Sequence, residues 1–177
     1  GSIVTVTNEG NAELTVTPPK THIATVGIEK IVPSMEHATV LLRLLSRAAI
    51  GAEITQYTTF YNGPKRKGDA DGPENMHIVL VDNHRTEMLG EFLRPMLRCI
   101  RCGACMNHCP VYAAIGGHAY GSVYPGPMGS VLTPAMQDLN STKDLPNACT
   151  LNGRCKEVCP VNIPLTDMLR SLRARQF

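Results

Sequence analysis

The residues of this sequence best suited to bind a metal are its seven cysteines, which all lie between positions 99 and 159. Four of them stand in CIRCGACMNHCP, where two residues separate each of the first three, three precede the fourth, and a proline follows. Three thiolates at two-residue gaps can wrap one loop around a 4Fe–4S cube, while the fourth cysteine binds a second cluster. Gly103 and Ala104 are small enough to let backbone N–H groups approach the sulfides of the cube. The spacing therefore predicts an iron–sulfur protein.

Other uses of these cysteines fit the spacing less well. Zinc knuckles usually consist of two separated CxxC pairs, so a zinc site is the weaker alternative. Cysteines two or three residues apart in one loop are poorly placed to bridge each other, and an odd count does not suit a disulfide framework. We therefore expect a reducing compartment, the cytoplasm, with the thiols bound to metal.

A second run, CTLNGRCKEVCP, repeats the first when the two are aligned on Pro110 and Pro160, except that Asn152 stands where Cys102 stands. In bacterial ferredoxins the cysteine before the proline binds the other cluster, and this crossover divides the seven cysteines into two sets. The first set, predicted to bind a 4Fe–4S cluster, is Cys99, Cys102, Cys105 and Cys159. The second set is Cys109, Cys149 and Cys155.

Asn152 decides the type of the second cluster. An amide oxygen is a poor ligand for iron among sulfides, because these clusters select soft thiolates, and three thiolates suit a 3Fe–4S cluster. Two alternatives stay open: a second 4Fe–4S cluster in which Asn152 is a chance substitution, or a 4Fe–4S cube with one iron open to a substrate. The C-x5-C-x3-C-P spacing resembles the second cysteine run in the iron–sulfur subunits of succinate dehydrogenase and fumarate reductase. That resemblance implies one 4Fe–4S and one 3Fe–4S cluster.

The part of the chain before the cysteines, residues 1–92, has an α/β pattern. A helix is expected from Ser34, its N-cap, with Met35, Ala38, Leu41, Leu42, Leu45 and Ala49 on one face. A polar loop is expected over 62–75. Strands are predicted at 2–8, 14–18, 22–28, 53–61 and 76–83, the first two as a hairpin around NEGN. Because the strands have the apolar pattern of burial on both faces and only one helix can cover them, we expect further chain before Gly1 or a partner.

The cysteine-containing part, residues 93–177, is predicted to be α-helical. A helix from about position 84, kinked at Pro95, should lead into Cys99. Short and amphipathic helices are expected at 110–115 and 163–175, on either side of a Gly/Pro-rich loop over 116–129. Tyr112 and Tyr120 should pack around the clusters. The arginines of the last helix, at 170, 173 and 175, are interpreted as a solvated face, with partner docking as the second interpretation.

Charge and hydropathy exclude several functions. With 17 basic and 15 acidic residues the net charge is +2, which gives no reason to expect nucleic-acid or membrane binding. No apolar run approaches the roughly 18 residues of a transmembrane helix, and no signal peptide opens the chain. The glycines of 116–129 do not form a G-x-G-x-x-G nucleotide fingerprint, and no flavin or nicotinamide motif is present.

Five stretches together resemble the iron–sulfur subunit of the bacterial three-component lactate-utilisation system. They are GSIVTVTNEGN, HIATVGIEKIVPS, GPKRKGDADGPENMHIVLVDN, RCIRCGACMNHCPVY and IGGHAYGSVYPGPMGSVLTP. The resemblance implies a partial α/β lactate-utilisation domain over 1–92, related in fold to the ribose-5-phosphate isomerase and CoA-transferase group, and a two-cluster ferredoxin-like domain over 93–177. It also implies that the chain acts with partner subunits in oxidising L-lactate to pyruvate. Much of the family's N-terminal domain and its C-terminal extension are absent from this sequence.

Two further residues are candidates for binding. His118 in GGHAYG could hydrogen-bond a cluster sulfide or a substrate carboxylate, or could be a packed loop residue. Glu9 resembles the acidic residue of CoA-transferase-like sites, although a turn glutamate is the simpler interpretation. No catalytic residue is assigned.

The sequence thus favours an electron-transfer subunit over a catalytic one, with two clusters that each carry one electron. The alternatives are a hydroxy-acid enzyme that uses an open 4Fe–4S cube as a Lewis acid, and a scaffold subunit that the clusters stabilise without redox turnover.

Overall fold

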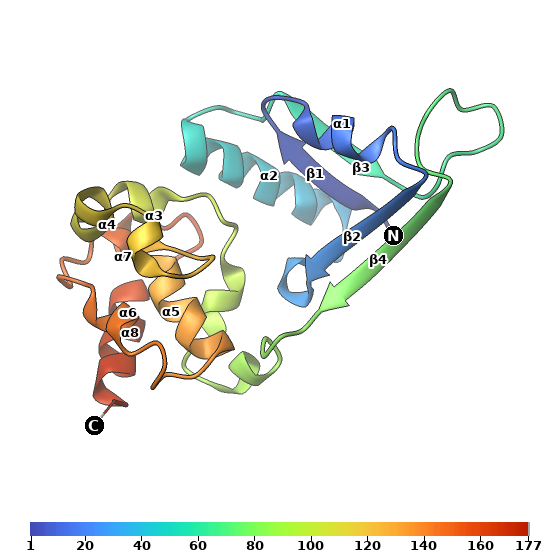
Figure 1. Ribbon diagram of the computed structural model, residues 1–177. Helices are drawn as coiled ribbons and strands as arrows, with labels where there is room; N and C mark the ends of the chain where they lie inside the picture. The colour runs from blue at the N-terminus through green and yellow to red at the C-terminus, as the bar shows by residue number, and fades with distance from the viewer. Residues whose placement is uncertain (177) are drawn as a thin grey trace. The chain divides into compact units, whose positions relative to one another are not determined.

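The computed structural model describes residues 1–176, which fall into two compact units that divide between Val81 and Asp82 (Figure 1). Residues 82–92, which the sequence assigned to the first domain, contribute Met88 to the hydrophobic core of the second unit. Within the described residues no helix is both long and apolar enough to cross a membrane.

The first unit contains two separate two-stranded sheets. Strands β1 (Ile3–Thr7) and β3 (Tyr57–Tyr61) pair antiparallel, with Ile3 opposite Tyr61. Strands β2 (Thr21–Gly27) and β4 (Asn75–Val81) pair parallel, with Thr21 opposite Asn75. A parallel pair needs a long crossover, and here the 3-10 helix η1 (Ile28–Lys30), helix α2 (Met35–Ile50) and strand β3 lie between its two strands in the chain.

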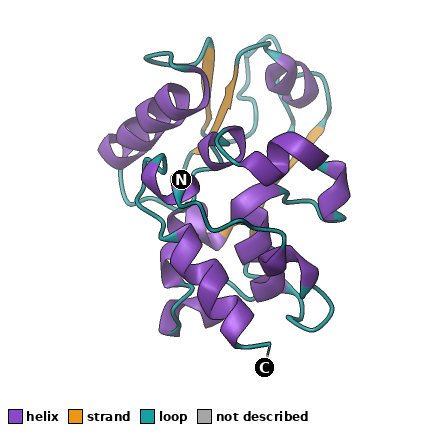
Figure 2. Ribbon diagram, turned by 90° about the vertical axis from the view of Figure 1, so that its left-hand side faces the viewer, coloured by secondary structure: helices purple, strands orange, loops and turns teal. Residues whose placement is uncertain are grey.

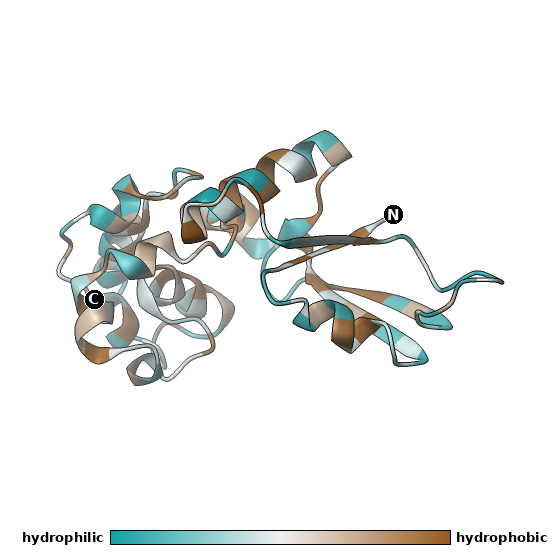
Figure 3. Cartoon of the chain, turned by 90° about the horizontal axis from the view of Figure 1, so that it is seen from above, coloured by the Kyte–Doolittle hydropathy of each residue, from teal (hydrophilic) through white to brown (hydrophobic). Residues whose placement is uncertain are grey.

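Helix α2 begins where the sequence predicted. The Ser34 hydroxyl accepts a hydrogen bond from the backbone N–H of His37 at 3.5 Å, and Gly51 ends the helix in the left-handed conformation. Its buried residues are Ala38 and Ser46, whereas Met35 is half exposed, so the predicted apolar face is only partly covered. Figure 3 shows hydrophobic stretches on the strands of this unit, and Ile78, Val79 and Leu80 of β4 are exposed. Strand β4 thus lacks, within the described residues, the cover that was expected to come from further chain or from a partner.

The predicted strand over 14–18 is wrong, because residues 14–16 belong to helix α1 (Asn11–Val16). The helix starts after Gly10, whose φ of 70° turns the chain out of β1. Glu13 then accepts hydrogen bonds from Thr59 Oγ1 at 2.7 Å and Thr7 Oγ1 at 3.3 Å. These contacts with both strands of the first sheet outweigh the β-propensity of the segment.

The second unit is built from short helices joined by loops (Figure 2). Their bounds are η2 Glu87–Gly90, η3 Arg94–Arg98, α3 Ala104–Asn107, α4 Pro110–Ile115, η4 His118–Tyr120, α5 Gly126–Met136, α6 Asp144–Asn147, α7 Arg154–Glu157 and α8 Leu165–Ala174. The predicted helices at 110–115 and 163–175 are confirmed as α4 and α8. The single helix predicted from position 84 is wrong: two 3-10 helices stand there, separated at Glu91–Leu93.

Helix α5 forms the centre of the second unit. Its residues from Gly126 to Pro134 are all buried, and Val131 is fully enclosed. The sequence analysis expected a loop as far as 129, because glycine and proline are poor helix formers. Burial against α8, η3 and α3 stabilises a helix that propensity alone disfavours.

Candidate iron–sulfur site

The two cysteine runs adopt the same backbone conformation. Arg101 and Leu151, at equivalent positions, have φ of 62° and 56°, and the glycines two residues further on have φ of 80° and 86°. A positive φ is unusual for arginine or leucine, so its recurrence at the same place marks a shared loop and not two unrelated turns. Each loop then enters a single helical turn, α3 or α7. The repeat seen in the sequence is therefore a repeat of structure.

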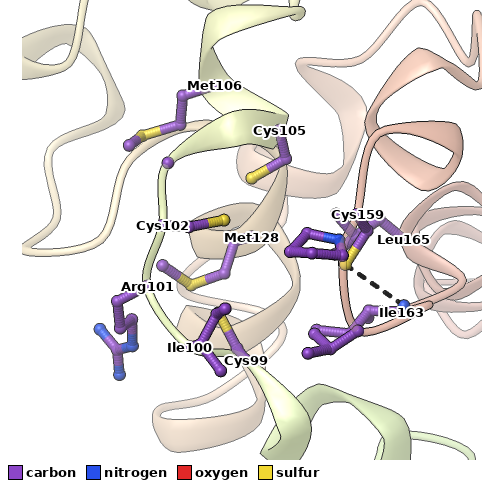
Figure 4. Close-up of a pocket in the computed structure, with 13 residues that line it drawn as sticks. Cys99, Ile100, Arg101, Cys102, Cys105, Met106, Met128, Cys159, Ile163 and Leu165 are labelled. Atoms are coloured by element: carbon purple, nitrogen blue, oxygen red, sulfur yellow. Dashed lines mark hydrogen bonds between the residues drawn. The ribbon is translucent and has the colours of Figure 1, made fainter. Parts of the chain in front are cut away.

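The structure brings the four cysteines of the first set together around one cavity (Figure 4). Cys159 comes from the second run and joins the three cysteines that start the first run. The cavity wall also contains the apolar side chains of Ile100, Met106, Met128, Ile163 and Leu165. Cys159 is the residue that the predicted crossover assigns to this set, and its role as a ligand stays a prediction.

The Cys105 thiol lies where a negative charge is poorly solvated. Burial, with smaller contributions from Cys99, Cys102 and Cys155, raises the pKa of Cys105 to about 12. The backbone N–H of Met128, in the first turn of α5, donates to Cys105 and opposes this shift. Another backbone N–H, that of Ile163, donates to Cys159 Sγ at 3.4 Å. Thiolates gathered here require a positively charged group to stabilise them, which iron of a cluster would supply.

The cysteines of the second set interact with one another. Burial raises the pKa of Cys155, and the nearby Cys149 and Cys109 raise it further. All three accept backbone hydrogen bonds: the Tyr112 N–H donates to Cys109 Sγ at 3.4 Å, the Leu151 N–H donates to Cys149 Sγ at 3.3 Å, and the Lys156 N–H donates to Cys155. The structure therefore gathers this set as well, and surrounds it with N–H donors of the kind that stabilise cluster sulfur.

Tyr120 lies beside the second set. Its ring is buried, and it is tilted against Tyr112 with 6.2 Å between the ring centroids. Burial raises the pKa of Tyr120 to about 12, and its hydrogen bond with Cys109 acts in the same direction. The sequence analysis assigned this tyrosine only to packing; its hydroxyl also contacts one of the predicted ligands.

The Asn152 side chain forms a hydrogen bond within its own loop. The side chain is exposed, and its Oδ1 accepts a hydrogen bond from the backbone N–H of Arg154 at 3.2 Å. This is a local side-chain-to-backbone turn of the kind asparagine commonly makes, and it supports the start of α7. The amide oxygen is thus engaged by the backbone at the position where the first loop carries Cys102.

The other predicted residues have different positions. Gly103 precedes α3 in the left-handed conformation, and Ala104 is the first residue of that helix. His118 is exposed and does not line the first cavity. Glu9 is exposed in the turn after β1. In the described residues, no group of three or more His, Cys, Asp or Glu side chains could hold a single metal ion.

The interpretation of the last helix as carrying a solvated arginine face is wrong for Arg173, which is partly buried, whereas Arg170 and Arg175 are exposed as predicted. Arg173 donates hydrogen bonds to the backbone carbonyls of Pro146, Asn147 and Cys149. Arg175 pairs with Glu91 at 3.4 Å and stacks on the Phe92 ring. No sequence pattern distinguishes these two from Arg170, because their partners lie far away in the chain.

Comparison with protein families accounts for both units. The model of the LUD domain matches residues 1–81, and the model of the 4Fe-4S dicluster domain matches residues 95–163. The chain joins a LUD domain to a 4Fe-4S dicluster domain. Both matches confirm the resemblance to the lactate-utilisation family that the sequence suggested.

Several curated proteins are similar to the whole chain. The uncharacterized electron transport protein YkgF of Escherichia coli K12 is 53% identical over 169 residues, which are 96% of this chain and 36% of that protein. Lactate utilization protein B is 52% identical over 176 residues in Anoxybacillus flavithermus, 99% of this chain and 37% of that protein. In Geobacillus thermodenitrificans it is 52% identical over 169 residues, with 96% and 36% covered. The chain thus spans little more than a third of these relatives. No solved structure matches it significantly.

Proposed function

We propose that the chain is an iron–sulfur electron-transfer subunit of a complex that oxidises L-lactate to pyruvate. The observation that carries the proposal is the gathering of Cys159 with the first three cysteines at one cavity, next to which Cys155 interacts with Cys109 and Cys149. Relatives named lactate utilization protein B, and one named as an electron transport protein, support the lactate-linked redox role.

In this proposal the dicluster domain holds a 4Fe–4S cluster on Cys99, Cys102, Cys105 and Cys159, and a 3Fe–4S cluster on Cys109, Cys149 and Cys155. Such clusters, when bound, accept and release single electrons. The protein's own part is to exclude water with the side chains around α5 and to donate backbone N–H groups to the thiolates. Both effects stabilise the bound clusters and help to set their reduction potentials.

The proposed electron balance follows from the substrate. Oxidation of the lactate hydroxyl to the pyruvate carbonyl releases two electrons and two protons. We assign this two-electron step to a redox cofactor on another part of the complex, which passes electrons singly to this chain. The electrons then pass from this chain, one at a time, to an electron-accepting partner protein. The proposed use of the cysteines as cluster ligands supports a cytoplasmic location with partner subunits of the same system.

The decisive experiment determines iron, sulfide and the EPR spectrum of the chain purified without oxygen. We expect ~7 iron atoms per chain and, after mild oxidation, the near-isotropic signal of an oxidised 3Fe–4S cluster. About 8 iron atoms before oxidation would favour an open or complete second cube. Absence of the 3Fe–4S signal would refute the assignment of the second cluster.

Substitution of Asn152 tests the same assignment from the other side. Asn152→Cys restores the fourth thiol in a loop whose backbone already matches that of the first run. We expect the 3Fe–4S signal to be replaced by that of a second reducible cube. Asn152→Ala is the matched control, because it removes the amide without adding a ligand, and it should keep the 3Fe–4S signal. Reduction of the clusters by lactate in the presence of the partner subunits then tests the electron-transfer role; clusters that stay oxidised during turnover contradict it.

A further inference from the structure

The guanidinium of Arg173 holds the segment that enters the second cysteine loop. Arg173 lies in the last turn of α8, and its Nε donates to the Pro146 carbonyl at 2.8 Å. Its Nη2 donates to the Asn147 carbonyl at 3.3 Å and to the Cys149 carbonyl at 2.6 Å. One side chain thus connects three carbonyls within four residues, and the last of them belongs to a predicted cluster ligand.

The Pro146 carbonyl needs a donor from elsewhere in the fold. Helix α6 ends at Asn147, and the last carbonyls of a helix have no partner within it. Leu145 and Pro146 are buried, so water is a poor substitute at this helix end. Arg173 supplies the missing donor and adds hydrogen bonds to the carbonyls of Asn147 and Cys149, since its planar fork presents several N–H groups in fixed directions.

Hydrogen bonds consequently hold Cys149 at its carbonyl, its thiol and its backbone N–H. Its carbonyl accepts the short hydrogen bond from Arg173, and its Sγ accepts the N–H of Leu151 at 3.3 Å. Its own N–H donates to the Asn147 carbonyl at 2.8 Å. Together these bonds restrain the backbone and the thiol of Cys149, which interacts with Cys155.

The arginine is itself held by a rigid element. One face of α8 is buried in the core through Leu165, Met168, Leu169 and Leu172, and Leu169 is fully enclosed. A second link runs parallel to the first, because Asn147 Nδ2 donates to Gln176 Oε1 at 2.9 Å and Gln176 Nε2 donates to the Lys143 carbonyl at 2.9 Å. The end of α8 therefore fastens the end of α6 and the start of the ligand loop.

We propose that Arg173 is a positioning residue for the second cluster, acting through the backbone of Cys149. The inference rests on the proposed function, since it requires a cluster on Cys109, Cys149 and Cys155. It assigns to α8 a role that the family matches do not cover, because the dicluster model ends at residue 163.

The test compares Arg173→Gln and Arg173→Lys with Arg170→Gln in the full chain. Arg170 lies on the same helix and is exposed, so its replacement is the matched control. The measurement is the rate at which the EPR signal of the second cluster disappears in the presence of an iron chelator. For Arg173→Gln we expect loss that is about 10- to 100-fold faster, the usual effect of removing a residue that orients a ligand. The first cluster, followed in the same samples, should be lost at the parent rate.

The lysine variant separates positioning from charge. Lysine keeps the positive charge but offers a single ammonium group, which cannot connect all three carbonyls. Arg173→Lys should therefore lose the second cluster faster than the parent while keeping its reduction potential. Arg173→Gln should also lower that potential, because a nearby positive charge favours the more negative reduced cluster.

Three outcomes would overturn the inference. One is loss of the second cluster from Arg173→Gln at the parent rate. Another is loss of both clusters together with a lower melting temperature in both Arg173 variants, which would indicate a general role in folding. The third is a parent chain that holds only the first cluster, and this result alone would also refute the proposed function.

Discussion

Replacement of Gly129 by alanine should displace the start of α5 and destabilise the dicluster domain. A Cβ built at this position overlaps the carbonyl group of Tyr124 and lies 3.2 Å from its Cα. All three atoms belong to the backbone, so no change of rotamer relieves the overlap, and the helix must move by more than ~1 Å. The move affects Met128, whose N–H donates to Cys105, and Val131, which is fully buried.

The size of the effect follows from this geometry. Forcing extra volume into a packed core costs about 1–3 kcal/mol, occasionally more. For a domain of this size, 1 kcal/mol corresponds to a shift of about 4–8 °C in melting temperature, so we expect a decrease of about 4–24 °C. Because Met128 borders the first cavity, the first cluster should also be lost faster than in the parent.

The assay is thermal unfolding at a fixed scan rate, together with visible absorbance as a measure of cluster content. Gly90→Ala is the matched control: an added Cβ there meets nothing within 4 Å, and the residue is exposed. The control should change stability by less than about 0.5 kcal/mol. A Gly129→Ala chain that melts within about 2 °C of the parent and keeps its first cluster would refute the reasoning.

Two further predictions concern hydrogen bonds. Tyr120→Phe removes the hydroxyl beside Cys109 and should lower the reduction potential of the second cluster, measured by EPR-monitored titration, whereas Tyr112→Phe should leave it unchanged. In the LUD domain, the hydrogen bond from Thr59 holds the pKa of Glu13 below 4.5, so its stabilisation is present above that pH and is lost as the pH falls through the lowered value. Unfolding curves between about pH 3 and pH 6 should show this loss in the parent but not in Glu13→Gln; equal pH dependence would contradict it.

Local signals in the sequence predicted the elements whose chemistry is self-contained. The N-cap of α2 was correct because the serine hydroxyl bonds within its own first turn. Helix α8 was correct because its apolar residues recur at helical spacing. The cavity lined by Cys99, Cys102, Cys105 and Cys159 lies where the predicted division of the cysteines requires one, and the division into two ligand sets stays a prediction.

Elements that depend on distant contacts were not predictable in this way. Helix α1 exists in place of a strand because Glu13 bonds to β3, which lies more than forty residues later. Helix α5 begins at Gly126 because it is buried on all sides, which outweighs its glycines and prolines. Arg173 has partners that only the folded chain brings near. In each case the deciding contact joins residues that no local pattern connects.

Asn152 shows how little separates the two cluster sites. The loop around it keeps the φ angles of the first loop at Leu151 and Gly153, so the backbone conformation does not depend on a thiol at position 152. Its amide instead bonds to Arg154 and contributes to the start of α7. The two loops therefore share these φ angles although only the first carries a thiol at this position. If the second cluster contains three irons, the reason lies in one side chain and not in the fold, because the backbone that would present a fourth thiolate is already in place.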